Sequence, residues 1–297
     1  MEYSTHESFI LVGDAIEWVS LCFLGLLFVE VVYDYFFRQK RSYRETISNL
    51  IAGFGSDLVG KLIANFVSAI GLIFFFRFAF WKIELSVQSW LGAVVAADFL
   101  YYWEHRFEHR VRLLWAYHST HHSSADFDLS TAYRLNWLEG FTSWIFFVPM
   151  VLVGFNPIQT FLSFVIVVEY QTWIHNKKIG RIRFLEGMLN TPSAHRVHHG
   201  SNSRYRDKNY GGVLMVWDRL FGTYTTEKED VIYGLSKNIE TRNPLLIQIH
   251  EFRAIWSDLR KNQSVLQTVD CLVRPPGWQS NGIKKGIPRG LPRSSQK

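Results

Sequence analysis

Three short segments of the chain concentrate imidazole side chains at helical spacing. Residues 105–109 (HRFEH) carry histidines at positions i and i+4, and residues 118–122 (HSTHH) and 195–199 (HRVHH) carry them at i, i+3 and i+4. Residues three and four apart share one helix face, so the spacing predicts that the rings of each segment converge on one point. One such triplet has a chance probability on the order of 1%, and three segments together far exceed chance. The candidate ligands are His105, His109, His118, His121, His122, His195, His198 and His199.

The last segment has its own helix signals, and a ninth histidine joins the set. Thr191 suits an N-cap, Pro192 suits the first helical position, and Gly200 fits just past the end. His175 ends an apolar stretch on the side where the segments are expected, so we include it as a ninth candidate ligand. The histidines at positions 6 and 250 have no histidine neighbours. We interpret His6 and His250 as surface residues.

Eight or nine imidazoles exceed what a single ion accepts, so the histidines predict two metal ions. Zinc takes four ligands and other first-row ions take at most six. No carboxylate falls within the triplet spacings, so neutral rings would bind cations whose charge the protein barely offsets. Imidazole suits iron, copper and zinc alike, and the spacing does not choose among them. Cys22 and Cys271 are the only cysteines, which excludes a disulfide framework or a cysteine zinc site as the organising device.

Polar residues near the histidines are candidates for orienting them. Asp98 lies two turns before His105 on the same helix face, and we expect it to accept a ring N–H, with helix packing as the alternative. Gln171 lies one turn before His175 and has either that role or a plain interhelical hydrogen bond. Glu169 is off that face, and we assign it no role.

These side chains need elements to position them, and the composition indicates membrane helices. Hydrophobic residues make up 48% of the 297 residues and aromatic residues 16%. Charged residues at the ends of or inside the apolar stretches leave buried core helices as an alternative. A run without charge at 140–157 contains the turn GFNP and predicts a hairpin that dips into the bilayer without fully crossing it. Five stretches approach the roughly 20 residues of a bilayer-crossing helix: 15–37, 58–81, 85–103, 138–156 and 157–175.

Positive charge predicts the orientation of these stretches. Basic clusters follow the first and third stretches, so both loops are expected in the cytoplasm. A turn back after each stretch then places the loop near 104–137 and everything from about 176 onward on that same side. The net charge of +6 therefore indicates a membrane surface, with no nucleic-acid partner. The opening MEYSTHE lacks a basic n-region, and we expect no cleavable signal peptide.

The predicted fold is all-α and integral to the membrane, with four to five apolar helices and a cytoplasm-facing, helical, histidine-rich metal cap. We divide it into N-terminal membrane helices (1–82), a catalytic domain with the three histidine segments (83–230), and a C-terminal cytoplasmic extension (231–297). From about residue 275 the extension is rich in Pro, Gly, Ser and basic residues, which predicts a mobile tail. We expect a multi-pass protein of the endoplasmic reticulum in a eukaryote, or of the inner membrane in a bacterium.

The order HxxxH, HxxHH, HxxHH around hydrophobic hairpins resembles the fatty acid hydroxylase and sterol desaturase superfamily of membrane di-iron oxygenases. The resemblance runs from about residue 90 to 225. Within it, the segments 121–132, 190–200 and 207–223 look most like the alkylglycerol monooxygenase-like members. One departure is Ala194, where that subgroup usually has a histidine.

The resemblance implies a chemistry, a cofactor and partners. The eight histidines of the segments would be catalytic and would hold two non-haem iron ions, with His175 as a ninth ligand. The irons would activate O2 and attack a C–H bond of a membrane lipid, giving an alcohol or an alkene. Electrons would come from a b-type cytochrome, a ferredoxin, a reductase or a reduced pterin.

Several alternatives stay open at this point. The substrate could be a sterol, an ether lipid or an aminolipid, and the histidines do not separate them. A non-enzymatic metal carrier or haem-binding membrane protein is the alternative of a different class. A carrier needs ligands along a path through the bilayer, whereas the histidines here are predicted to gather on one side.

Overall fold

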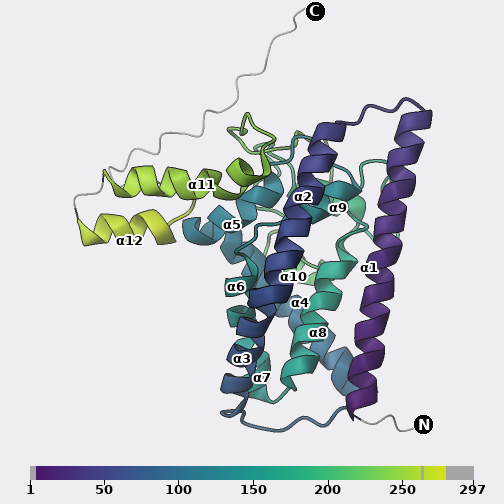
Figure 1. Ribbon diagram of the computed structural model, residues 1–297, viewed down its shortest axis with the longest axis vertical. Coiled ribbons are helices and arrows are strands. Elements are labelled where there is room, and N and C mark those ends of the chain that lie inside the picture. Colours follow the sequence, from purple (N-terminus) through teal and green to yellow (C-terminus); the bar gives the residue numbers. More distant parts are fainter. Residues whose placement is uncertain (1–4, 262–263, 279–297) are drawn as a thin grey trace, which may run out of the picture.

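The computed structural model describes residues 5–261 and 264–278, and its regular elements there are helices, with two isolated β-bridges among the loops. The predicted all-α class is therefore confirmed. Most of the tail that the composition predicts to be mobile lies outside the described residues. The helices form an upright bundle with a cap of short helices and loops at one end, from which two further helices extend sideways (Figure 1).

Two long helical segments are apolar enough to cross a membrane. The first is α1 (Thr5–Phe36), and the second is a continuous run of α2 (Tyr43–Val59), a π-helical turn (Gly60–Ala64) and α3 (Asn65–Phe76). Both leave large apolar side chains exposed, such as Trp18, Phe28 and Phe54. The core helices of a soluble protein bury such groups, so this exposure favours a lipid surrounding. The second helix begins at Tyr43 and ends at Phe76, so the predicted bounds of 58–81 were wrong.

The third apolar stretch is helix α4 (Val87–Arg110), which carries the first histidine segment at its far end. Ser86 and Ser89 form a reciprocal capping box at its start. The helix continues seven residues beyond the predicted end at 103. Val111 is extended and turns the chain into α5 (Arg112–His122), which carries the second segment. Consecutive packed helices therefore bring the first two histidine segments together.

The fourth and fifth stretches form the predicted hairpin. One arm is α6 (Gly140–Ser143), a 3-10 turn (Trp144–Phe147) and α7 (Val148–Val153), and the other is α8 (Pro157–Tyr170). At the turn Gly154 has φ +122°, and a Cβ there would stand 2.4 Å from the carbonyl oxygen of Trp81, so only glycine fits. Each arm is 14 residues and ~21 Å long. That is shorter than the ~30 Å apolar thickness of a bilayer.

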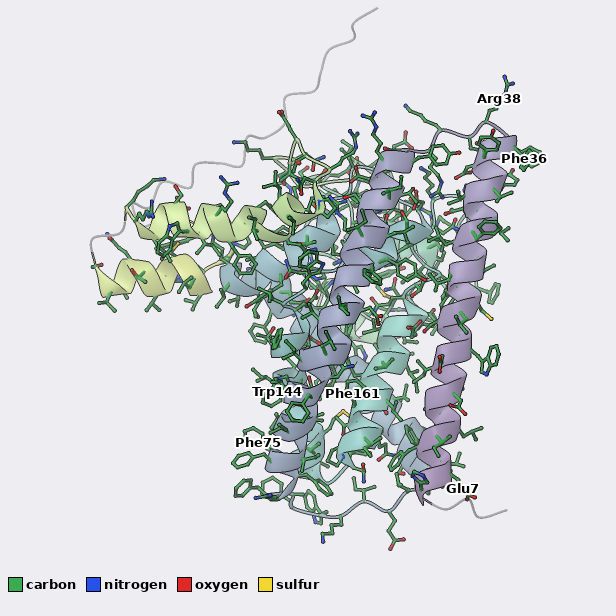
Figure 2. The ribbon with its side chains drawn as sticks, in the orientation of Figure 1. Glu7, Phe36, Arg38, Phe75, Trp144 and Phe161 are labelled. Carbon is green, nitrogen blue, oxygen red and sulfur yellow. The ribbon has the colours of Figure 1, made fainter. Side chains whose placement is uncertain are left out.

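The arms of the hairpin pack against α3 and α4 around an apolar core. Leu72, Ala93, Phe147 and Val167 are buried in it. Figure 2 shows Phe75 and Trp144 beside each other near the lower end of the bundle, where their ring centroids are 6.4 Å apart. The core therefore lies between the membrane helices and the hairpin, below the cap.

The cap gathers the loops that the charge pattern predicts to share one side. It contains a 3-10 turn (Leu129–Tyr133), α9 (Pro192–His198) and α10 (Val216–Leu220), with α11 (Pro244–Leu259) and α12 (Val265–Val273) at its edge. Arg41 forms buried ion pairs with Asp34 at 2.7 Å and Asp128 at 3.0 Å, and Lys178 reaches Asp34 at 2.7 Å. These contacts join the ends of three apolar stretches, so the shared side is confirmed. Its cytoplasmic location remains a prediction.

A buried arginine holds the cap to α2. The Arg134 guanidinium donates to Glu45 Oε1 at 2.9 Å, to Asn49 Oδ1 at 2.8 Å and to the Thr120 carbonyl at 3.0 Å. Burial lowers the pKa of Arg134 to about 10. The side chain nonetheless stays charged at neutral pH, and it neutralises the buried Glu45 carboxylate. One cation therefore connects the membrane helix to the helix of the second histidine segment.

We expect Arg134→Met to lower the stability of the protein by about 3–5 kcal/mol, because it leaves Glu45 buried without its main partner. The matched control is Arg242→Met, which removes a second, half-exposed partner of the same carboxylate at 3.2 Å and should cost less than about 1 kcal/mol. Thermal unfolding of both variants in detergent measures the difference. Equal melting temperatures for the two variants would contradict the assigned role of Arg134.

Candidate metal centre

The nine predicted histidines meet in two groups at the cap end of the bundle. Within each group the ligating ring nitrogens all lie within 4.8 Å of one another. Eight of the nine side chains are buried, and His109 is partly buried. The five-histidine group consists of His105, His109, His118, His122 and His198. The four-histidine group consists of His121, His175, His195 and His199.

The two triplets each divide between the groups, so the prediction that each triplet converges on one point was wrong. In every segment the i and i+4 histidines share a group, whereas the i+3 histidine belongs to the other group. The reason is the 100° turn per residue: i+4 is displaced by about 40° from i, and i+3 by about 60° in the opposite direction. A triplet therefore spans an arc wide enough to face two centres.

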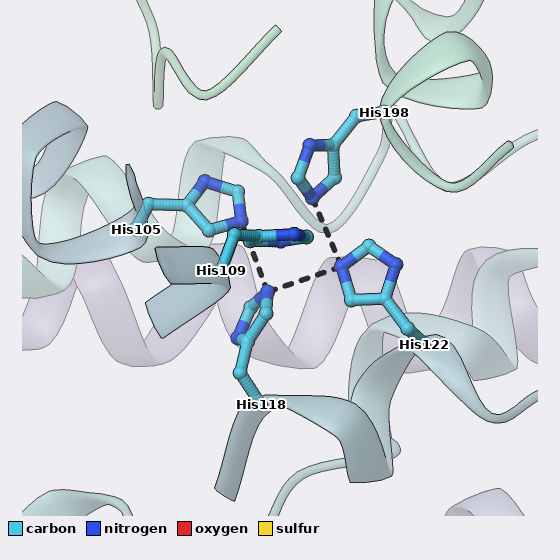
Figure 3. A group of neighbouring side chains, drawn as sticks. All are labelled: His105, His109, His118, His122 and His198. Carbon is cyan, nitrogen blue, oxygen red and sulfur yellow. Dashed lines mark hydrogen bonds between the residues drawn. The ribbon is translucent and has the colours of Figure 1, made fainter. Parts of the chain in front are cut away.

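The ring nitrogens approach one another closely in both groups. In the five-histidine group, Nε2 of His118 lies 3.0 Å from Nε2 of His105 and 3.1 Å from Nε2 of His122 (Figure 3). Nε2 of His122 lies 3.0 Å from Nε2 of His198. In the four-histidine group, the corresponding distances are 3.1, 2.9 and 3.2 Å along the series His121, His175, His195 and His199. Two nitrogens bound at right angles about 2.1 Å from one ion would stand about 3.0 Å apart. The spacing therefore fits a pair of metal sites.

Backbone carbonyls determine which ring nitrogen faces each group. The Nδ1–H groups of His105, His175 and His198 donate to the carbonyls of Tyr210 (2.9 Å), Gln171 (2.7 Å) and Lys208 (3.1 Å). A neutral imidazole has one N–H, so Nε2 of each of these rings carries a lone pair toward its group.

The pair His105 and His198 shows what these lone pairs require. Both rings donate Nδ1–H to a backbone carbonyl, so both Nε2 atoms carry a lone pair toward the five-histidine group, whose ligand atoms lie within 4.8 Å of one another. Lone pairs directed at the same point repel each other unless a cation lies between them. In addition, Nε2 of His109 is buried without a hydrogen-bond partner. The donor set therefore fits a metal ion in the five-histidine group.

Burial keeps the imidazoles of the third histidine segment neutral. Burial and the neighbouring histidines lower the pKa values of His195 and His199 well below the usual 6.5, and they lower that of His198 to about 3. At pH 7 these rings need not lose a proton to bind a cation.

Carboxylates lie closer to the centre than the sequence predicts. Glu108 and Glu139 approach Nδ1 of His118 at 3.1 and 3.6 Å, and the three residues form a further group with ligand atoms within 4.8 Å. Burial raises the pKa of Glu108 well above its usual 4.5, so this acid tends to stay neutral, and the expectation that the protein barely offsets the charge of the cations stays a prediction. The available signal was the sequence EHRFEH, in which Glu104 and Glu108 repeat at i and i+4 beside the two histidines.

Asp98 has a different role from the one predicted. Its carboxylate accepts the backbone N–H groups of Val213 at 2.6 Å and Leu214 at 3.0 Å and the indole N–H of Trp217 at 2.9 Å. It contacts no ring N–H, because seven residues of helix place His105 about 10 Å further along the axis. Asp98 instead holds the loop that leads into α10.

The acid that does support a histidine is Asp218, which the sequence reasoning missed. Its carboxylate accepts the N–H groups of Tyr210 at 2.8 Å and Gly211 at 2.7 Å and the hydroxyl of Thr223 at 2.6 Å. The carbonyl of Tyr210 in turn accepts Nδ1–H of His105. The stretch 207–223 carried the only signal for Asp218, through its resemblance to the superfamily.

The remaining expectations around the histidines have mixed outcomes. The backbone of Gln171 orients His175, while its side chain accepts the Tyr101 hydroxyl of α4 at 3.1 Å, which is the interhelical alternative. Glu169 accepts a hydrogen bond from Ser20. His6 is exposed as predicted, but His250 is half-buried, with Nε2 3.2 Å from the Ser119 hydroxyl of α5. The surface prediction for His250 was wrong, because the packing of α11 on α5 is not visible in local sequence.

The local prediction for the third segment is confirmed. Thr191 caps α9 by accepting the N–H of Ala194, and Pro192 occupies the first helical position. The helix ends at His198, just before Gly200, where a Cβ would stand 2.8 Å from the ring of Tyr205. The N-cap at Thr191 therefore sets the direction in which the helix of the third histidine segment leaves the preceding loop.

We expect Asp218→Ala to weaken metal retention by the five-histidine group about 10- to 100-fold, because it removes the support of the carbonyl that orients His105. The four-histidine group should keep its affinity. Metal content after graded chelation measures both groups, and Asp230→Ala, an exposed acid in the following loop, is the control. Equal losses from both groups, or none, would be inconsistent with this positioning role.

The lowered histidine pKa values predict acid sensitivity of the metal-free protein. Below about pH 6.5 the unfolded chain takes up a proton at each imidazole, whereas buried rings such as His195, His198 and His199 stay neutral. Each such ring should remove up to about 1.4 kcal/mol of stability per pH unit as the pH falls from 6.5 toward its folded pKa. Melting temperatures after chelation, from pH 7 to about pH 5, test this. His6→Gln, at an exposed site, should keep the wild-type slope, and a flat wild-type profile would refute the prediction.

Comparison with known proteins tests the resemblance of the histidine segments. Residues 90–223 match the family model described as fatty acid hydroxylase. The resemblance read from the histidine segments is thereby confirmed, and this part of the chain is similar to the fatty acid hydroxylase family. All three histidine segments fall within the matched residues.

Individual relatives include alkylglycerol monooxygenases, an ornithine lipid hydroxylase and a CER1-like protein. The chain is 34% identical to human alkylglycerol monooxygenase over 294 residues, which cover 96% of this chain and 65% of the human protein. It is 24% identical to the ornithine lipid hydroxylase OlsE of Rhizobium tropici, over 70% of this chain and 67% of that protein. It is 28% identical to CER1-like 1 of Arabidopsis thaliana, over 57% of this chain and 28% of that protein. The chain thus spans slightly less than two thirds of the human relative, and no solved structure matches it significantly.

Proposed function

We propose that the protein is a membrane-bound non-haem di-iron oxygenase that uses O2 to hydroxylate a C–H bond of a lipid. The observation that carries this proposal is the meeting of nine histidines in two groups at the end of apolar helices. The groups adjoin, because the rings of His122 and His199 stack with centroids 4.4 Å apart. The family match and the hydroxylases and monooxygenases among the relatives support the same reaction class.

The donor set supports two iron ions, with each group holding one. Iron accepts up to six ligands, so five and four imidazoles leave positions for O2. Hydrolytic two-metal sites and structural zinc sites use carboxylate bridges or thiolates, which neither group contains. When bound, the iron pair supplies the reduction of O2 with external electrons and the insertion of one oxygen atom into a C–H bond. All nine histidines are proposed ligands.

The protein itself positions the ligands and excludes water. Backbone carbonyls keep the Nε2 lone pairs of His105, His175 and His198 directed at the groups. The carboxyl group of Glu108 lies 3.1 Å from Nδ1 of His118. The ring of Phe127, which is 1% exposed, lies 5.0 Å from that of His199 and stacks on Tyr233 at 4.8 Å. These aromatic rings cover the four-histidine group, so a reactive oxidant would meet substrate in preference to water.

A lipid substrate follows from where the groups lie. Helix α4 runs from an apolar stretch directly into His105 and His109, so a chain lying in the bilayer could reach the centre along it. The names of the relatives favour a glycerol ether lipid or an aminolipid, and sterol or alkene-forming chemistry is the second candidate. The electron donor is proposed to be a b-type cytochrome, a ferredoxin, a reductase or a reduced pterin. We propose a multi-pass protein with the domain limits 1–82, 83–230 and 231–297, in the endoplasmic reticulum or a bacterial inner membrane.

Metal analysis and lipid analysis of the same variants test this function. The wild-type protein should hold two iron ions per chain, and His198→Ala and His195→Ala should each lose most of the ion in their own group. Cells supplied with isotopically labelled O2 should make a lipid that gains one labelled oxygen atom. Either variant should lower its yield at least about 100-fold, because the two ions act as a unit.

The matched control is His250→Gln, which changes a histidine beside the second segment but outside both groups. It should keep two iron ions and near-normal product. Full occupancy by redox-silent zinc, or product formation that persists in His195→Ala and His198→Ala, would rule out the proposed oxygenase. A lipid product that has two hydrogen atoms fewer than its substrate and no labelled oxygen would indicate the alkene-forming reaction in place of hydroxylation.

A further inference from the structure

Helices α11 and α12 form a hairpin that projects sideways from the cap, across the direction of α1 and α2 (Figure 1). Its attachment point is the start of α5. The backbone N–H of Arg112 donates to the Arg274 carbonyl at 3.1 Å, and the Arg112 guanidinium donates to Cys271 Sγ at 3.2 Å. Arg112 follows the end of α4 at Arg110. The hairpin is therefore fixed where the apolar helix gives way to the polar cap.

One face of α12 is apolar and uncovered. Val265, Leu266, Val269 and Val273 are 82%, 70%, 46% and 50% exposed. Residues 265, 269 and 273 repeat at i, i+4 and i+8, so they share one side of the helix. The opposite side buries Cys271. Four large apolar side chains on one face of about two helical turns are unfavourable in water, which indicates a partner for this face.

The acidic side chains of the hairpin are all paired. Glu251 and Asp258 pair with Arg112 at 2.9 Å, Lys261 also pairs with Asp258 at 3.2 Å, and Asp270 pairs with Arg274 at 3.1 Å. Arg253 and Arg260 of the hairpin are exposed and form no ion pair among the described residues. The sequence after residue 278 adds five basic residues and no acidic residue. An apolar face with basic residues beside it is the pattern of a helix that lies in the surface of an anionic bilayer.

We propose that α12 lies in the head-group layer of the bilayer that α1 crosses, with its apolar face inserted and the neighbouring basic residues on anionic lipids. Figure 1 shows α12 on the side of α11 toward the end of the bundle where α3 and α7 lie, which is the membrane side of the hairpin. The attachment to Arg112 sets the depth, since α4 places only about 26 Å of apolar helix (residues 87–103) below it. The hairpin thereby anchors α5, the helix of the second histidine segment, to the membrane surface.

Depth-dependent fluorescence quenching tests this placement in the full chain. In a background with Cys22→Ala and Cys271→Ala, one variant carries Leu266→Cys on the apolar face of α12. The matched variant carries Ser257→Cys, an exposed position on α11. Both are labelled with an environment-sensitive dye and placed in nanodiscs with or without anionic lipid. A shallow lipid-borne quencher should reduce emission from the label at position 266 at least about twofold more than from the label at position 257.

Two further variants separate the possible outcomes. Val269→Asp should release the label at position 266 from quenching while metal content stays at the wild-type level, which shows that the protein remains folded. Anionic lipid should increase the quenching of the label at position 266, and Arg253→Glu with Arg260→Glu should reduce that increase. Equal quenching at both positions would overturn the proposal. A second result would also overturn it: the label at position 266 is shielded from water but is not quenched by the lipid-borne quencher, and it becomes exposed to water when each nanodisc holds one chain. The apolar face would then bind a second copy of the chain.

Discussion

The structure depends on holding neutral imidazole rings against one another in two buried groups. Their Nε2 atoms lie 2.9–3.2 Å apart, and hydrogen bonds to the opposite nitrogen of His105, His175 and His198 direct the Nε2 lone pairs of these three rings at the groups. The carbonyls of Tyr210, Gln171 and Lys208 each come from a segment that lies outside the three histidine segments. Metal affinity therefore resides as much in the loops that present these carbonyls as in the histidines.

Buried charges hold the cap to α1 and α2. Arg41 and Lys178 pair with acids at the end of α1, and Arg134 pairs with Glu45 at the start of α2. The acids of these pairs are buried, so loss of a basic partner leaves a charge that water solvates poorly. Helices α1 and α2 are thus part of the support of the histidine groups.

The sequence predicted which histidines meet better than it predicted the boundaries of the elements that support them. Side-chain spacing is local, so the histidine segments and the cap at Thr191 could be read directly. The second membrane helix was placed 15 residues too late, because its first turns carry polar residues such as Glu45 and Asn49 that face Arg134. Hydropathy alone interprets such polar turns as loop. The roles of Asp98, Asp218 and His250 depend on contacts between segments more than 100 residues apart or on loop conformation, which spacing does not encode.

The division of each triplet between two groups explains why the i, i+3, i+4 spacing occurs twice. A helix with histidines only at i and i+4 serves one centre, as α4 does with His105 and His109. Adding i+3 lets the same helix contribute one ring to the other centre, about 100° away around its axis. The second segment gives two rings to the five-histidine group and one to the four-histidine group, and the third segment does the reverse. A shift of either helix would therefore disturb both groups at once, which couples the two proposed metal sites mechanically.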